Sequence, residues 1–271
     1  LSMEGTGGTL SLDGGAGATG GEVSLRSGSG STSRGGAINV EAGSGLGTGG
    51  AIKISGGESR LGLGDGGAVK VEGGASYGTG SGGALLLAGG ASDEGAGGSV
   101  VMRSADSTST LEDSGSLVIT SGSSISKSSG SVSILTGDTL NADAGSVLMQ
   151  AGSSMGSEET SGGSVVVNAG SGIEGGSVLI SAGESDSDDV EEAVGGSLSL
   201  TGAGSASLKT TSSDVLDSGA ITISSGSSIG VTGSIFMSTG SSKADDAGGV
   251  TIIAGQGKNE GAPVSIEAGS A

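Results

Sequence analysis

Short apolar segments alternate with polar, glycine-rich segments along the whole chain. The apolar segments share one phrase, Gly-small-Φ-x-Φ-x-small-Gly, in which Φ is an aliphatic residue or Met and x is variable. The phrase recurs seventeen times at spacings of 13 to 23 residues. Its first Φ residues are Leu10, Val23, Ile38, Ile52, Val69, Leu85, Val100, Leu117, Val132, Val147, Val165, Val178, Leu198, Ile221, Ile235, Val250 and Val264. Repeats of this size, with two alternating apolar residues between glycines, are typical of a β-solenoid.

The two Φ residues of a phrase are two positions apart, so an extended strand places them on one face and the intervening residue on the other. Gly opens every phrase except the last, which begins with Ala262, and Gly ends every phrase except two, which end at Ala105 and Ala203. Such columns of small residues predict tight turns. The sequence therefore predicts an all-β fold, a parallel β-solenoid of about seventeen short strands that forms a single repeat array over residues 1–271.

The number of strands in each coil is left open by the pattern. Two or three strands per coil are favoured, because loops such as residues 29–36 contain no apolar residue that could complete a one-strand coil. An antiparallel meander is an alternative. The first phrase (8–15) and the last (262–269) resemble the middle ones, so neither looks like a cap. We therefore expect either a segment of a longer array or a unit that stacks end to end.

Composition and charge limit both the core and the partners. One Phe, one Tyr and no Trp predict a thin aliphatic core. A formal net charge of −19 argues against nucleic acid or an anionic membrane as partner, since both bind basic surfaces. No run of 18 apolar residues is present, so no membrane span is expected. The absence of Cys shows that the fold does not depend on disulfides.

Two familiar catalytic or cofactor patterns occur and are discounted. The GxGxxG matches at residues 62–67 and 78–83 lead into predicted strands, whereas a pyrophosphate site needs a following helix. The GxSxG matches at residues 152–156 and 226–230 lack the usual base, because the chain has no His. We therefore expect no enzymatic activity and no organic cofactor.

A cluster of carboxylates at residues 186–192 is the strongest candidate metal site, and the acidic pairs at residues 158–159, 245–246 and 93–94 are weaker ones. The cluster comprises Asp186, Asp188 and Asp189, followed by Glu191 and Glu192. Clustered carboxylates suit Ca²⁺, which takes six to eight oxygen ligands. The spacing of an EF-hand is missing, so solvated charge is the favoured interpretation and calcium binding is the alternative.

The residue between the two Φ positions changes character along the chain. Early phrases place Ser24, Asn39, Lys53 and Lys70 there, as expected of a solvated face. Middle phrases, apart from the one with Ser133, place apolar residues there, which define a predicted association stripe: Leu86, Val101, Val118, Leu148, Val166 and Leu179. A contiguous apolar stripe predicts something that packs against it, either another part of the same chain or a neighbouring molecule.

Two phrases carry a resemblance to known repeats. Gly-Gly-Ser-Val-Val-Val-Asn-Ala-Gly (162–170) and Ser-Gly-Ala-Ile-Thr-Ile-Ser-Ser-Gly (218–226) resemble the Gly/Ser-rich repeats of large secreted or cell-surface proteins of diatoms and related algae. More distantly, they are similar to the solenoid repeats of filamentous haemagglutinin-type adhesins. The resemblance implies an extracellular or cell-surface location and a structural or adhesive role without catalysis.

The predicted function is therefore that of a non-catalytic structural unit. We expect a protomer or segment of an extracellular filament, sheath or adhesive surface layer, which self-associates into fibres by end-to-end stacking of solenoids. The alternative is a surface-binding module that uses a flat solenoid face to bind ice or a polysaccharide. Only Thr222 and Thr251 supply outward threonines, which is little support for a regular ice-binding array.

Overall fold

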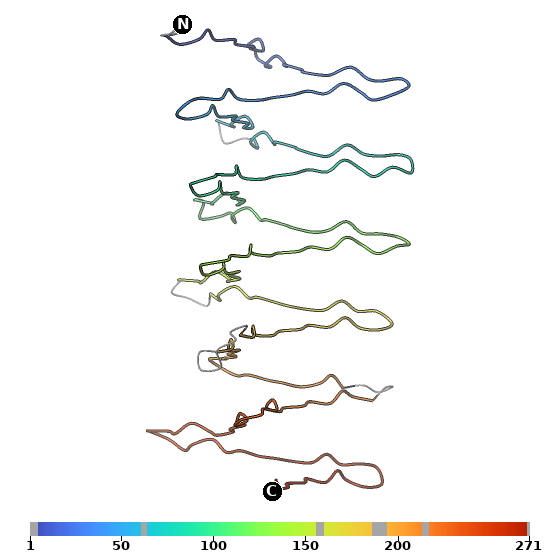
Figure 1. Cartoon of the computed structure of the whole chain (residues 1–271), viewed down its shortest axis with the longest axis vertical. Coiled ribbons are helices and arrows are strands. Elements are labelled where there is room, and N and C mark those ends of the chain that lie inside the picture. Colours follow the sequence, from blue (N-terminus) through green and yellow to red (C-terminus); the bar gives the residue numbers. More distant parts are fainter. Residues whose placement is uncertain (1–4, 61–63, 156–159, 186–193, 213–216, 270–271) are drawn as a thin grey trace. The chain divides into compact units, whose positions relative to one another are not determined.

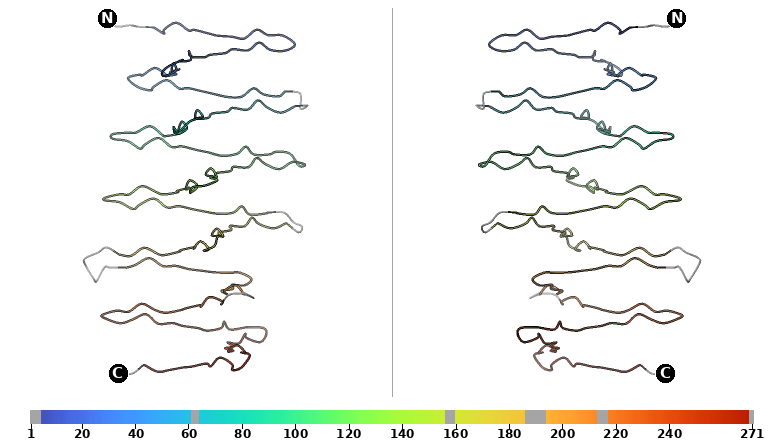
Figure 2. Two further views of the ribbon diagram at one scale, coloured as in Figure 1. Left: turned by 90° about the vertical axis from the view of Figure 1, so that its right-hand side faces the viewer. Right: turned by 90° about the vertical axis from the view of Figure 1, so that its left-hand side faces the viewer.

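The computed structural model describes residues 5–60, 64–155, 160–185, 194–212 and 217–269. Within these ranges the chain forms no helix and no strand. It runs instead as extended segments joined by loops, as the traces in Figure 1 and Figure 2 show. The extended segments are the Φ-x-Φ phrases, and the loops are the polar stretches between them. The described residues therefore contain no helix that could cross a membrane.

The predicted parallel β-solenoid is wrong for the part of the chain that the structure describes. A solenoid needs backbone hydrogen bonds between the phrases of successive coils, and no described Φ-x-Φ residue makes a backbone bond to another phrase. The physical reason lies in the composition. Ordering a chain with 63 glycines is costly in backbone entropy, and a few aliphatic side chains per phrase offer little apolar area to offset that cost.

The expected aliphatic core is also absent, because no described residue is buried. The accessible surface of the chain is 27358 Å². A globular protein of this mass would expose about 10,000 Å², and a fully unfolded chain about 36,000 Å². The exposed area is thus closer to that of an unfolded chain, and the aliphatic side chains lie in water.

Within each phrase the predicted alternation of faces persists without strand pairing. Leu85 and Leu87 are 53% and 63% exposed, whereas Leu86 between them is 85% exposed. Side chains two positions apart also meet on the outward face: the Lys70 Nζ lies 2.9 Å from a Glu72 carboxylate oxygen. The backbone of a phrase is therefore locally extended, with the Φ pair on one side.

Eleven of the loops are each closed at their base by a single backbone hydrogen bond, and we call such a closed base a neck. The N–H of the residue that opens one phrase donates to the carbonyl of the residue that ends the phrase before it. At residues 74–83, for example, the Gly83 N–H donates to the Gly74 oxygen at 2.8 Å. Eleven such bonds occur among the described residues, and they close loops of different lengths. The glycine columns are thus paired across loops.

The necks are also the most closely packed points of the described chain. Ser27, Ala42, Ser104, Ala151 and Ala254 are less exposed than every other described residue. All five occupy the small position just before the phrase ends. At the neck of residues 28–36, the Ser27 hydroxyl additionally donates to the Gly36 carbonyl at 3.0 Å. The closest packing among the described residues is therefore at the necks, whereas the large aliphatic Φ residues are all at least 47% exposed.

Some necks approach so closely that only Gly fits the small position. At Gly73, a Cβ atom would overlap the carbonyl oxygen of Gly83 across the loop. Gly56 and Gly89 stand in the same relation to the opening glycines of their next phrases. Where the small position is Ala42, the neck has room for its Cβ. The small column therefore reflects close backbone approach.

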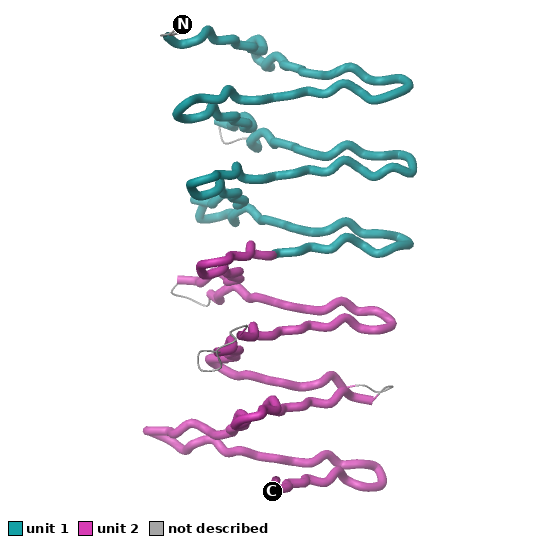
Figure 3. The backbone as a smooth tube through the Cα atoms, viewed as in Figure 1, with its two compact units in different colours: residues 1–134 teal, residues 135–271 magenta. Residues whose placement is uncertain are grey.

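The chain divides into two compact units, Leu1–Ile134 and Leu135–Ala271. Figure 3 shows them in teal and magenta. The boundary falls inside the phrase of residues 130–137, and each unit repeats the same local pattern of extended phrase and closed loop. Membership of a single, longer repeat array stays a prediction.

Candidate association surface

Among the described residues, no three His, Cys, Asp or Glu side chains lie close enough together to hold a metal ion. The predicted calcium ligands Asp186, Asp188 and Asp189 lie outside those residues, so calcium binding stays a prediction. The glycines of residues 78–83 lie in a loop that leads into an extended phrase and not into a helix.

An open hollow lies beside Lys209, Thr210, Thr211 and Ser212. Its lining supplies one ammonium group and three hydroxyls, with no carboxylate, imidazole or thiol. The hollow gives no reason to assign a reaction to the chain.

All six residues of the predicted association stripe are largely exposed. The exposed fraction runs from 72% at Val166 to 88% at Leu179. The pattern allows the stripe to pack against another part of the same chain, such as a second sheet. The described residues, however, form no sheet. The stripe is therefore not covered by another part of the described chain. Its role in association stays a prediction.

The Φ residues beside the stripe are exposed as well. The least exposed large aliphatic residue in the described chain is Ile38, at 47%. In phrases whose outward residue is apolar, three consecutive large apolar side chains therefore meet water, on both faces of the segment. A solvated surface strand would normally keep one of those faces polar.

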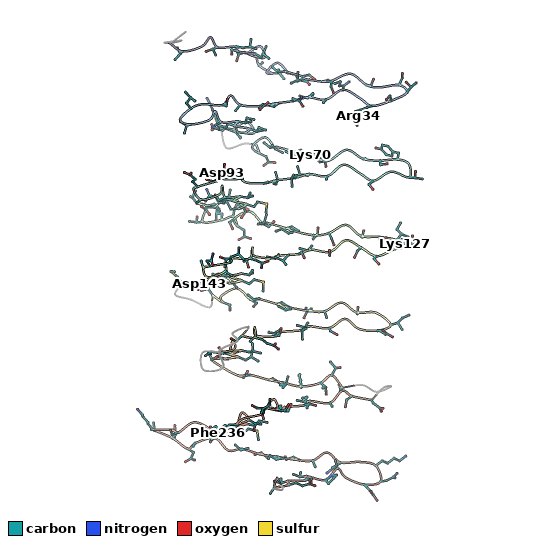
Figure 4. All side chains as sticks on the ribbon, in the orientation of Figure 1. Arg34, Lys70, Asp93, Lys127, Asp143 and Phe236 are labelled. Atoms are coloured by element: carbon teal, nitrogen blue, oxygen red, sulfur yellow. The ribbon has the colours of Figure 1, made fainter. Side chains whose placement is uncertain are left out.

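Charged residues are distributed unevenly between phrases and loops. Each of the first five phrases, within residues 8–74, carries at least one charged residue. The regular phrases between residues 115 and 255 carry none, and their neighbouring charges lie in loops. Figure 4 shows Lys70 on an early phrase, Lys127 and Asp143 on loops, and Phe236 on an uncharged phrase. The chain thus separates charge from apolar segments after its first part.

The structure also identifies an eighteenth phrase that the sequence pattern missed, at residues 204–211. Its Φ positions are Ala206 and Leu208. A Cβ atom on Gly219 would lie 3.5 Å from the Thr210 methyl group, much as one on Gly196 would lie 3.4 Å from the Ala182 Cβ. Ala at the first Φ position and Thr in place of the final Gly hid this phrase from a search for two large aliphatic residues between glycines.

Comparison with known proteins identifies no related protein. No protein-family model matches the chain, no curated protein matches its sequence and no solved structure matches its fold. The resemblance to algal and adhesin repeats therefore stays a prediction. Function has to be argued from the chemistry of the phrases themselves.

Proposed function

We propose that this chain is a non-catalytic structural segment of an extracellular filament, sheath or adhesive surface layer, and that it acts by self-association. The observation that carries the proposal is the exposure of every large aliphatic residue in the described phrases. A chain that repeats one apolar phrase so often, and buries none of its copies internally, is suited to burying them between molecules.

The energetic argument rests on the number of phrases. Burying one Val, Leu or Ile side chain that was exposed contributes about 1.5–3 kcal/mol. A single pair of phrases gains too little to overcome the entropy lost on association. Many phrases joined in one chain can offset this entropy together. After the first pair of phrases has made contact, the remaining pairs form within the same two molecules and lose less entropy.

The negative charge of the chain opposes this association and makes its extent depend on the salt concentration. The net charge of −19 makes copies of the chain repel one another, and this repulsion weakens as salt increases. The same charge disfavours nucleic acid and anionic membranes as partners. Placement at the cell surface or outside the cell is supported by the resemblance of residues 162–170 and 218–226 to secreted repeats.

The mode of assembly differs from the one that the sequence predicted. End-to-end stacking of solenoid coils would extend an existing ladder of backbone hydrogen bonds, and the described chain has no such ladder. The proposal therefore relies on contacts along the phrases.

The test is sedimentation velocity on the intact chain over a wide range of concentrations, followed by negative-stain electron microscopy. We expect species much larger than 24.8 kDa that grow with concentration and appear as filaments or sheets. A single monomeric species at the highest concentration would contradict the proposal. Tight binding of that monomer to an insoluble polysaccharide would favour the surface-binding module instead.

A further inference from the structure

We propose that certain phrases pair with the same phrases of a second copy of the chain, through backbone hydrogen bonds as well as side chains. We call them the triple-apolar phrases, because each has three consecutive large apolar residues and no charge. They are residues 83–90, 115–122, 145–152, 163–170, 176–183 and 233–240. This inference rests on the proposed function and specifies where and how self-association occurs.

The first argument concerns the backbone. The described Φ-x-Φ residues make no backbone hydrogen bond to another phrase, and the neck bonds are not continued along the segments that they join. Their N–H and C=O groups are therefore open to water along an extended segment. An extended segment with open backbone groups is a template for the addition of another strand.

The second argument concerns the side chains. In residues 163–170 the central residues Val165, Val166 and Val167 are 56%, 72% and 62% exposed, so both faces present apolar surface. Strands that are buried on both faces have such continuous apolar runs. Short uncharged segments of β-branched and aliphatic residues without Pro also form dry, interdigitated contacts between sheets of identical strands.

The third argument identifies a second copy as the partner. Like phrases are complementary to one another, and the phrases concerned carry no charge, so the repulsion between copies is confined to the loops. The surface of 27358 Å² also exceeds by roughly 17,000 Å² what a globular chain of this mass would expose. A stable interface needs about 1,600 Å² in total, so the exposed surface is ample for contacts with several copies.

Early phrases differ in the feature that prevents such pairing. Lys53 and Lys70 occupy the outward position that Val118 or Leu179 occupies later. Charged side chains on an exposed strand discourage edge-to-edge pairing, because pairing would bury or crowd the charge. Residues 8–74 are therefore expected to stay solvated in the assembly.

The experiment compares two full-length variants that add the same charge at the same position of the phrase. V166K/L179K alters two triple-apolar phrases, and S24K/N39K alters two early phrases. Both change the net charge from −19 to −17, because two neutral residues become Lys. A smaller net charge reduces repulsion between copies, so overall electrostatics would favour assembly of both variants.

Assembly is measured as the fraction of chain that sediments, and strand pairing by fibre diffraction of the sedimented material. We expect V166K/L179K to lower the sedimented fraction at least tenfold and S24K/N39K to change it less than twofold. Wild-type material should give a reflection at about 4.8 Å, the spacing of hydrogen-bonded strands.

Three outcomes would overturn this inference while leaving the proposed function intact. They are unchanged assembly of V166K/L179K, equal losses in both variants, and wild-type assemblies without the strand-spacing reflection. Failure of the wild-type chain to associate at all would overturn the proposed function together with the inference.

Discussion

Residues 8–74 and residues 115–183 share one local structure but differ in what they present to solvent. Neck bonds close loops in both regions, for example Gly50 N–H to Gly43 at 2.8 Å and Gly176 N–H to Gly170 at 2.9 Å. The first Φ residues are similarly exposed, 53% at Ile52 and 56% at Val165. The outward residue and the charges of the phrase differ, and the described loops at residues 122–130 and 137–145 lack the neck bond that closes all four loops of the first region.

This comparison separates two roles within the phrase. The glycine and small columns mark where each phrase ends and its loop begins, and they do so in both regions. The outward residue determines whether an extended phrase is compatible with water or favours contact with another molecule. Geometry and adhesion are therefore encoded by different positions of the same repeat.

The largest effect on assembly is expected when outward charged residues within residues 8–74 are replaced by apolar residues like those within residues 115–183. K53V/K70V would replace two outward ammonium groups by apolar side chains, so that residues 50–57 become a triple-apolar phrase and residues 67–74 gain three consecutive apolar residues beside Glu72. Burial of each new Val contributes about 1.5 kcal/mol or more. The concentration at which the chain begins to sediment should then fall by about tenfold per residue.

K127V/K243V provides the matched control, because it removes the same charge from two loops. Light scattering over a dilution series measures both thresholds. If the loop variant lowers the threshold as much as K53V/K70V does, charge and not the outward position governs association.

A somewhat smaller effect is expected from a charge on a Φ position. In a solenoid, V165D would place an unpaired charge in a core and lower the free energy of unfolding by several kcal/mol. Val165 is exposed, so the dilute chain should show no cooperative unfolding transition with or without the substitution, by calorimetry. Assembly should instead weaken by about tenfold, because the contact between copies would have to bury the carboxylate.

S171D supplies the comparison for this test, since Ser171 lies in the loop that follows the same phrase. It should leave both calorimetry and assembly nearly unchanged. A cooperative transition in the dilute wild-type chain, lost in V165D, would restore an internal core and contradict the account.

The sequence predicted the local features of this chain better than its fold. The glycine and small columns lie where phrases end and loops begin, and close approach at the small position Gly73 leaves no room for a side chain, whereas the bends themselves lie inside the loops. The alternation of faces follows from the two-residue period and needs no long-range contact. Pairing between distant phrases depends instead on whether apolar burial offsets the entropy of ordering many glycines, and a periodic pattern cannot decide that balance.

The candidate association surface could be predicted in part from the sequence, because the face on which a residue lies depends only on local periodicity. Val166 and Leu179 could be placed on the outward face, whereas their exposure depends on whether the chain forms a second layer. The phrase containing Leu208 was missed because Ala206 and Thr211 depart from the repeat. The acidic residues Asp186, Asp188 and Asp189 lie outside the described residues, so their proposed role needs a solution experiment.

A moderate effect is expected from salt. Raising NaCl shortens the screening length to about 10 Å at 0.1 M, which weakens repulsion between copies with a net charge of −19. Assembly measured by light scattering should therefore increase several-fold with NaCl. A decrease with salt would indicate that attractive ion pairs, and not the apolar phrases, join the copies.

Calcium distinguishes bridging from screening when it is compared with Na⁺ at matched ionic strength. If the cluster at residues 186–189 binds Ca²⁺, the calcium curve will lie above the sodium curve, and D186N/D188N/D189N will remove the difference. Identical curves for the wild-type chain would exclude a specific calcium role in assembly.

The smallest effect is expected at a single neck. In G73A the new Cβ would overlap the Gly83 carbonyl, so the bond from the Gly83 N–H to the Gly74 oxygen should open. Amide exchange at Gly83 should then accelerate a few-fold. G74A is the adjacent control, since a Cβ at Gly74 meets no atom within 4 Å and exchange at Gly83 should be unchanged. Equal acceleration in both variants would contradict the close-neck geometry.

Hydrogen exchange of the wild-type chain at low and high concentration tests the central claim most directly. If the chain has no core and is completed by other copies, Φ-x-Φ amides of the triple-apolar phrases within residues 115–183 will exchange rapidly in dilute solution. They will become protected as the concentration rises, while those of residues 8–74 stay unprotected. Protection that is already present in the dilute monomer and independent of concentration would contradict the account.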